Sequence, residues 1–247
     1  FLAEVRTSLA TIQSAVANLA DAEGQAAGTL KVSMGNAFGR EYIVPLLGDF
    51  LSLHPAIVPD WHFDNRQVDL IAEGFDAAIG GGFELPPGLV ARDLAPVHIV
   101  LLASRAYLAD RPALTHPDQL KQHAGIFIRS PQTGRIRPWA LINCKDAHRN
   151  VHFPIDMRIR MSMSDPAAAL EAAEQSLGIA VASMPNAQPY LLSGRLVRVL
   201  TDWYADAGAL SLYFPAQRLL PAKTRAFVDF VVSYFRKNKL AQRFSAY

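Results

Sequence analysis

The sequence lacks the means to form an internal disulfide bond, because Cys144 is the single cysteine among its 247 residues. This cysteine content is typical of a reducing compartment, so we expect the protein in the cytoplasm. Long apolar runs are also missing, and none approaches the length that spans a bilayer. The net charge of +2 is too small to indicate a nucleic-acid or membrane surface on this chain. We therefore predict no membrane partner.

Motifs for catalysis and metal binding are missing as well. The sequence contains no Gly-x-Ser-x-Gly elbow, no His-Glu-x-x-His pair and no phosphate-binding loop. His148 and His152 lie near Cys144, but their spacing fits neither a zinc pair nor a known nucleophile turn. We therefore predict no catalytic residue, no metal and no cofactor, and we interpret Cys144 as a buried or loop thiol.

The first residues carry a heptad pattern instead. Apolar side chains recur in alternating steps of three and four residues, at Leu2, Val5, Leu9, Ile12, Val16 and Leu19. Such a seam is typical either of an amphipathic helix packed on its own domain or of a coiled coil that dimerises the protein. We favour the coiled coil. Because no Met precedes Phe1, we expect this linker helix to join a module upstream of Phe1 to the rest of the chain.

After Gly28 the pattern alternates between strand and helix. We expect strands at 30–34, 57–63, 76–79, 124–128, 155–161, 179–182, 196–199 and 209–214, two more within 89–102, and helices at 38–53, 66–73, 165–177, 185–193 and 221–235. Pro45 should kink the first helix or mark its true start nearby, and Asp165 should cap the third. A β-α-β-α-β order predicts a parallel sheet with helical crossovers, and the whole order favours two α/β lobes with a cleft between them.

Short motifs follow one another along the chain in a recognisable order. They are Gly28-Thr29-Leu30-Lys31-Val32, Pro45-Leu46-Leu47 with Phe50 and His54-Pro55, Val68–Ile79, Ala91-Arg92-Asp93-Leu94, Ala103-Ser104 with Tyr107-Leu108, His116–Leu120, Leu177-Gly178-Ile179-Ala180, Gly194-Arg195-Leu196-Val197 and Arg225–Phe230. Each motif alone is weak. Together they resemble the linker helix and effector-binding domain of LysR-type bacterial transcriptional regulators, over essentially the whole chain.

The resemblance implies an α/β fold of the two-lobed, periplasmic-binding-protein-like type 2, preceded by a linker helix. It implies a linker dimerisation helix at 1–27, effector-binding subdomain I at 28–104 plus 207–247, and subdomain II at 105–206. A winged helix-turn-helix domain upstream of Phe1 would bind promoter DNA. Such proteins usually form homodimers or homotetramers, and a small-molecule effector in the cleft changes the geometry of the assembly on DNA.

The candidate ligand site lies beyond the carboxyl ends of the strands, where helices begin. We nominate Gly35, Asn36, Ala37, Phe38, Asn65, Arg66, Gly80, Gly81, Ser104, Phe127, Arg129, Ser162, Met163, Ser164 and Met184. Asn36 and Ser164 beside free backbone N–H groups would suit a carboxylate. The alternatives are turn or cap residues without ligand contact, a solvated Arg129 and a core methionine at 184.

The chain departs from the family pattern at Gly80-Gly81-Gly82, where the members closest to this pattern often carry an Arg after Asp-x-x-Ile. This departure argues against an anion clamped by arginine and leaves room for a larger or less charged ligand. Glycine also lets a backbone approach a ligand closely, although a flexible strand end is an equal interpretation. Two smaller departures are Ser104-Arg105 in place of Ser-Pro, and Ser176 in place of a frequent Gly.

Three functions fit this sequence. We favour the ligand-sensing domain of a LysR-type regulator, with a small molecule and promoter DNA as partners. A solute-binding protein of a transport system shares the fold, but it has no need of a dimerising heptad helix. An enzyme on the same scaffold would need an acid–base pair with perturbed pKa values in the cleft. We further expect this chain to bind duplex DNA no more tightly than a generic, weakly basic protein.

Overall fold

The computed structural model describes residues 26–146, 151–217 and 219–247. Unit 1 consists of the chain up to Leu94 and of Leu210–Ala241, and unit 2 consists of Ala95–Ala209 and Gln242–Tyr247. The chain therefore passes between the units after Leu94, after Ala209 and after Ala241. The heptad positions Leu2–Leu19 lie outside the described residues, so the linker dimerisation helix stays a prediction. The subdomain boundaries at residues 104 and 206 also stay predictions.

The sheet of unit 1 has the strand order β2–β1–β3–β11. Its strands are β1 (Gly28–Met34), β2 (Ile57–Phe63), β3 (Ala77–Gly81) and the last part of β11 (Trp203–Pro215). β1 is parallel to β2 and β3, and Val32 pairs with Trp61 on one side and with Ala77 on the other. β11 runs antiparallel to β3. The parallel β-α-β order predicted from the sequence is confirmed here.

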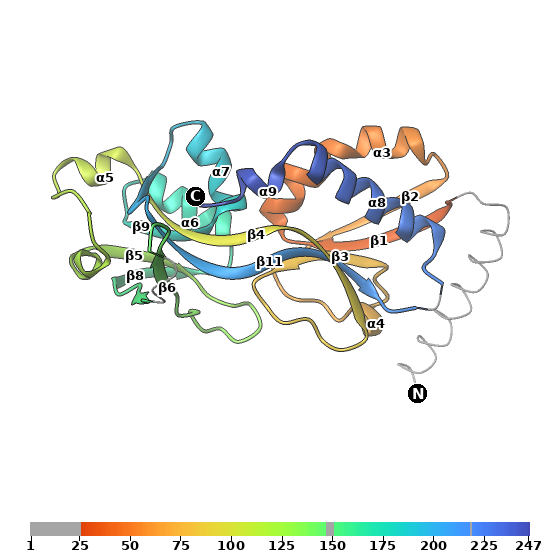
Figure 1. The fold of residues 1–247 in the computed structure, drawn as a ribbon, viewed down its shortest axis with the longest axis horizontal. Helices are drawn as coiled ribbons and strands as arrows, with labels where there is room; N and C mark the ends of the chain where they lie inside the picture. Colours follow the sequence, from red (N-terminus) through yellow and green to blue (C-terminus); the bar gives the residue numbers. More distant parts are fainter. Residues whose placement is uncertain (1–25, 147–150, 218) are drawn as a thin grey trace. The chain divides into compact units, whose positions relative to one another are not determined.

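The helices of unit 1 cover both faces of this sheet (Figure 1). One face carries α8 (Ala222–Lys237) and a helical stretch of four parts, α2 (Asn36–Phe38), η2 (Gly39–Ile43), η3 (Val44–Leu46) and α3 (Leu47–Leu53). The other face carries α4 (Leu70–Glu73). Phe50 of α3 meets Phe227 of α8 with ring centroids 5.7 Å apart. The helix predicted at 38–53 is thus present but segmented, because Pro45 has no N–H to donate within it.

Two predictions for unit 1 were wrong. The helix expected at 66–73 begins only at Leu70, because the Asp69 side chain accepts hydrogen bonds from the N–H groups of Ile71 and Ala72 and so caps it. The two strands expected within 89–102 are one continuous strand, β4 (Leu89–Ala103), which passes from unit 1 into unit 2. Pro96 is tolerated inside β4, since proline fits a strand position that donates no ladder hydrogen bond.

The sheet of unit 2 has the order β4–β9–β5–β8, and β10 (Val197–Val199) also pairs with β4. β5 (Ala124–Ile128) is parallel to β9 (Ile179–Ser183) and β8 (Arg158–Met163), whereas β9 is antiparallel to β4. The strand predicted at 155–161 corresponds to β8, which begins and ends later in the sequence, at Arg158 and Met163. β6 (Ala140–Asn143) and β7 (Phe153–Pro154) were not predicted; they form a small antiparallel sheet with the start of β11.

The core of unit 2 contains many alanine side chains. The helices are α5 (Arg105–Ala109), η4 (Pro117–Gln122), α6 (Pro166–Glu174) and α7 (Met184–Leu192), and α9 (Leu240–Arg243) begins in unit 1 and ends in unit 2. Ala169 and Ala173 of α6 are fully buried with Ala180 of β9. Such small residues let the helix lie close to the sheet. Across the described ranges, none of the helices combines the length and the apolarity needed to cross a lipid bilayer.

Candidate functional site

The nominated residues of unit 1 lie where the parallel strands β1 and β2 end. The Asn36 N–H donates to Asn65 Oδ1 at 3.1 Å, and the Asp64 N–H donates to the Met34 carbonyl at 2.9 Å. These contacts bring the Gly35–Phe38 segment and Asn65 together, although 29 residues separate Asn36 from Asn65 along the chain.

This corner of unit 1 offers polar groups beside a buried aromatic ring. Helix α2 starts after Gly35 without a side-chain cap. The first N–H groups of a helix have no acceptor within the helix, so those of Ala37 and Phe38 suit an anionic or carbonyl oxygen. The ring of Phe38 is buried and packs against Tyr42 with centroids 5.2 Å apart. The arrangement can bind an oxygen atom at the backbone and apolar atoms nearby.

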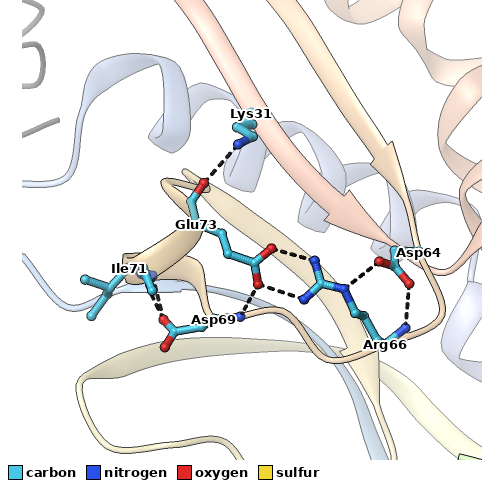
Figure 2. A network of polar contacts seen from close by, with 7 residues as sticks. Lys31, Asp64, Arg66, Asp69, Ile71 and Glu73 are labelled. Carbon is cyan, nitrogen blue, oxygen red and sulfur yellow. Dashed lines mark hydrogen bonds and ion pairs between the residues drawn. The ribbon is translucent and has the colours of Figure 1, made fainter. Parts of the chain in front are cut away.

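Arg66 lies between two carboxylates of its own unit (Figure 2). Its Nε donates to Asp64 Oδ2 at 2.7 Å, and its two terminal nitrogens donate to Glu73 Oε1 and Oε2 at 2.8 and 2.5 Å. These bonds raise the pKa of Arg66, and the hydrogen bond from Arg66 is the main reason why the pKa of Glu73 falls to about 2. The guanidinium is thus oriented by the protein itself, and a role for Arg66 in ligand binding stays a prediction.

Gly80 and Gly81 lie at the end of β3, paired with Ser211 and Leu210 of β11. A Cβ atom on Gly80 would lie 3.0 Å from Cζ of Phe83. The Phe83 ring in turn meets Tyr213 edge-on, with centroids 6.0 Å apart. Glycine at position 80 therefore leaves space for an aromatic side chain of the same unit.

The nominated residues of unit 2 cluster where β5 and β8 end side by side. Phe127 pairs with Ser162, and Ile128 pairs with Met163. The Arg129 N–H donates to the Met163 carbonyl at 2.8 Å, while the Arg129 side chain is exposed. Ser164 follows and is exposed, so its hydroxyl and the Arg129 guanidinium are accessible to solvent near one end of the sheet.

The residue after Ser164 is a helix cap. Asp165 Oδ1 accepts from the Ala168 N–H at 3.0 Å, which confirms the capping role predicted for it. The Asp165 carboxylate would repel an anion at the start of α6. An anionic ligand group would therefore suit Ser164 and Arg129 better than the backbone of α6.

Ser104 and Met184 have clear structural roles in unit 2. Ser104 Oγ accepts from the Tyr107 N–H at 3.1 Å, capping α5, and it lies 2.8 Å from Ser176 Oγ. Ser176 has a φ of 61°, the conformation in which glycine is favoured, so the serine found here in place of that frequent glycine makes a hydrogen bond that glycine lacks. Met184 belongs to the hydrophobic core, as in the alternative interpretation of that residue.

His, Cys, Asp and Glu are the side chains that could hold a metal ion in the described parts of the chain. No group of three or more His, Cys, Asp or Glu side chains in those ranges is arranged to hold a metal ion. Cys144 is half-buried against the unit 2 core, just after β6.

The sequence interpretation missed the carboxylates around Arg66. A partial signal was present, because Asp64 lies two residues before Arg66 and Glu73 lies seven residues after it. What the sequence did not show is that Glu73 turns back over Arg66 rather than toward solvent.

The chain is similar to transcriptional regulators in sequence and structure. A family model described as the LysR substrate binding domain matches residues 23–236. An HTH-type transcriptional regulator of Xanthomonas campestris pv. campestris (strain 8004) is 31% identical over 208 residues, which cover 83% of this chain and 59% of that protein. The HTH-type transcriptional regulator PgrR of Escherichia coli (strain K12) is 25% identical over 219 residues, covering 88% and 72%.

A solved structure supports the same assignment. The regulatory domain of AphB in Vibrio vulnificus has a TM-score of 0.67 and 27% identity, covering 85% of this chain and 99% of that domain. Regulatory domains of this kind have the two-lobed periplasmic-binding-protein-like fold, so the fold class predicted from the sequence is confirmed. The chain spans less than two thirds of the length of the Xanthomonas relative.

Proposed function

The chain belongs to the LysR substrate binding domain family, whose members are transcriptional regulators rather than enzymes, and from this premise we propose that it senses a small molecule. Regulators of this family bind effectors and DNA and assemble as oligomers. In our proposal this chain supplies the effector site, and promoter DNA is bound by a module outside it. The finding that carries the proposal is the family match over residues 23–236.

We propose that the effector binds where parallel strands end, and each unit by itself offers a candidate group of residues there. In unit 1, Asn65 orients the Gly35–Phe38 segment through its bond to the Asn36 N–H, and this supports a site for a carboxylate or carbonyl oxygen. In unit 2, Arg129 and Ser164 are the accessible polar groups at the ends of β5 and β8. Because Gly80 and Gly81 carry no charge and Phe83 and Tyr213 lie beside Gly80, we propose an effector that combines one carboxylate with an apolar or aromatic body.

Regulation follows from a difference in effector affinity between two states of the protein. The effector shifts the population toward the state that binds it more tightly, and it shifts nothing if both states bind it equally. We propose that the two states differ in the geometry of a homodimer or homotetramer, held in part by the heptad residues Leu2–Leu19, and that the protein acts in the cytoplasm. Lys and Arg of this chain contribute little to DNA affinity.

The test is a thermal-shift and calorimetry screen of the 247-residue protein against small carboxylates, aromatic acids, amino acids and sugars. A ligand that binds only the folded state stabilises it by RT ln(1 + [L]/Kd), which at a hundredfold excess over Kd is about 2.7 kcal/mol. We expect a saturable shift with an aromatic acid.

Variants in both units decide where that ligand binds. We expect Ser164→Ala to weaken binding about tenfold through the loss of one charge-assisted hydrogen bond. We expect Asn65→Ala to weaken binding by a similar factor, because the Gly35–Phe38 segment loses the contact with Asn65 that orients it. Ser52→Ala is the matched control, because its hydroxyl donates to the Gly48 carbonyl within α3 and is not in the candidate site. Binding that survives both site variants, or that Ser52→Ala weakens equally, would contradict the proposed site.

A further inference from the structure

Unit 2 holds a second polar and aromatic cluster that the proposed effector site does not use. It surrounds residues 244–247, which follow α9. Burial alternates along this segment: Phe244 is fully buried, Ser245 is half-buried, Ala246 is buried and Tyr247 is 74% exposed. Two of these four side chains are thus directed into unit 2, and Phe244 lies in a turn that the hydrogen bond from the Ser245 N–H to the Gln242 carbonyl closes at 3.2 Å.

Two side chains bind both backbone groups of Ala246. The Ala246 N–H donates to His98 Nδ1 at 2.9 Å, and the Ala246 carbonyl accepts from a terminal nitrogen of Arg198 at 2.7 Å. His98 belongs to β4 and Arg198 to β10. Main-chain recognition of this kind sets register and affinity, while pockets for alternate side chains set specificity.

Aromatic rings complete the contact. The rings of His98, Tyr204 and Tyr247 contact one another, with centroid distances of 4.5 Å for His98–Tyr204, 5.3 Å for His98–Tyr247 and 5.2 Å for Tyr204–Tyr247. His98 and Tyr204 are both buried. Burial lowers the pKa of His98, with Arg198 adding to this effect and Asp206 opposing it, so the neutral ring keeps the lone pair that Ala246 uses.

We propose that His98, Arg198 and Tyr204 form a peptide-binding seat, and that Phe244–Tyr247 occupies this seat as a strap that detaches and re-docks while unit 2 stays folded. Arg198 makes detachment feasible, because its other terminal nitrogen donates to the carbonyls of Thr201 and Trp203, at 2.8 and 3.4 Å. The half-buried guanidinium therefore keeps two backbone partners when the strap leaves. Of the four strap residues, only Phe244 and Ala246 are buried.

The strap also anchors the third passage of the chain. Helix α8 belongs to unit 1, and the chain joins unit 2 after Ala241. When the strap detaches, β4 and β11 remain as the connections between the units. The chain is therefore attached to unit 2 through β4, β11 and the strap when the strap is docked, and through β4 and β11 when it is detached.

Amide hydrogen exchange of the whole protein tests this proposal. In the wild type we expect the Ala246 amide to exchange at least tenfold faster than the amides of Ala180–Ala182 in β9, because the strap opens without global unfolding. His98→Leu removes the acceptor and should accelerate Ala246 exchange about another tenfold, with β9 changed less than twofold. His98→Asn keeps an acceptor oxygen and should stay within about threefold of wild type.

If the Ala246 amide and the β9 amides exchange at equal rates in the wild type, the proposal that the strap detaches is wrong. It is also wrong if His98→Leu accelerates the exchange of Ala246 and of β9 by the same factor. A second measurement uses the chain ending at Arg243 and a fluorescent peptide with the sequence of residues 240–247. We expect saturable binding to the shortened chain and none to the whole chain, whose seat is occupied. A shortened chain that does not fold, or that folds and binds no peptide, contradicts the proposal.

Discussion

At the scale of single residues, close packing and local charge decide what each position tolerates. Gly178, between α6 and β9, is an example. A Cβ atom there would lie 2.5 Å from the Ala124 carbonyl oxygen, which belongs to the backbone of a neighbouring strand and cannot move aside cheaply. Close packing against Ala124 therefore explains the glycine in the Leu177-Gly178-Ile179-Ala180 motif.

Gly178→Ala should lower the free energy of unfolding by about 1–3 kcal/mol because the added methyl group meets backbone atoms. Gly48→Ala is the matched control. Gly48 lies within α3, and a Cβ atom there meets nothing within 4 Å. We expect that control to be stabilising by about 0.5–1 kcal/mol, since alanine favours a helix over glycine. Urea denaturation measures both, and equal effects would contradict the packing argument.

The Glu73–Arg66 pair predicts a specific dependence of stability on pH. The pKa of Glu73 is about 2 in the folded protein and 4.5 ordinarily, so the folded state favours the carboxylate. The pair therefore stabilises the fold fully above about pH 4.5, and this contribution is lost as the pH falls toward 2. Because both side chains are partly exposed, solvent screening reduces the effect.

The comparison of wild type with Glu73→Gln measures this contribution. We expect the difference in urea midpoint to be constant from pH 7 to 5 and to shrink as the pH falls from 4.5 toward 2. Arg66→Gln removes the cation of the same pair, and its difference in urea midpoint from the wild type should shrink over the same pH range. A difference that grows on acidification would mean that the sign of the Glu73 pKa shift is wrong.

At the scale of elements, long-range polar contacts fix how helices meet the sheets. Lys223 in the first turn of α8 donates to Asp76 Oδ2 at 2.8 Å and also to the Thr29 carbonyl. Asp76 accepts in addition from the Lys31 N–H at 2.8 Å. Both partners of the Lys223–Asp76 pair are less than a fifth exposed. These bonds fasten the start of α8 to β1 and to the residue before β3.

Lys223→Met should cost about 2 kcal/mol, because it leaves a mostly buried carboxylate without its cation. Lys145→Met is the control. Lys145 pairs with Asp202 at 2.7 Å, but its side chain is 70% exposed, so we expect no measurable change in the urea midpoint. If the two variants lose the same stability, burial does not distinguish these pairs.

Elements also show where sequence patterns fail. The sequence of residues 89–102 predicted two strands, yet β4 is one strand that belongs to the sheet of unit 1 at its start and to the sheet of unit 2 at its end. β6 and β7 have no strong pattern of their own. They are strands because they pair with each other and because β6 also pairs with Trp203–Tyr204. Such pairing is set by contacts distant in sequence.

At the scale of the whole molecule, the charge balance predicts weak, nonspecific DNA binding by this chain. The net charge of +2 is spread over 247 residues. Affinity for duplex DNA depends on the number of phosphates neutralised. We expect fluorescence anisotropy with a 40-base-pair duplex to show binding no tighter than about 10⁻⁴–10⁻⁶ M at physiological salt, without sequence preference. Nanomolar, sequence-specific binding would show that this chain reads DNA itself.

The sequence by itself determined the class of fold and the family, because strand–helix alternation and ordered short motifs are local features of the chain. It also located the strand ends at Asn36, Asn65 and Ser164, since the carboxyl ends of parallel strands are predictable from element order.

The tertiary structure alone decided which side chains meet. It pairs Asn65 with Asn36, surrounds Arg66 with Asp64 and Glu73, joins Ser104 to Ser176, and seats Ala246 between His98 and Arg198, 148 and 48 residues away. The physical reason is that a hydrogen bond between distant residues depends on the packing of whole elements. No local pattern in the sequence encodes that packing.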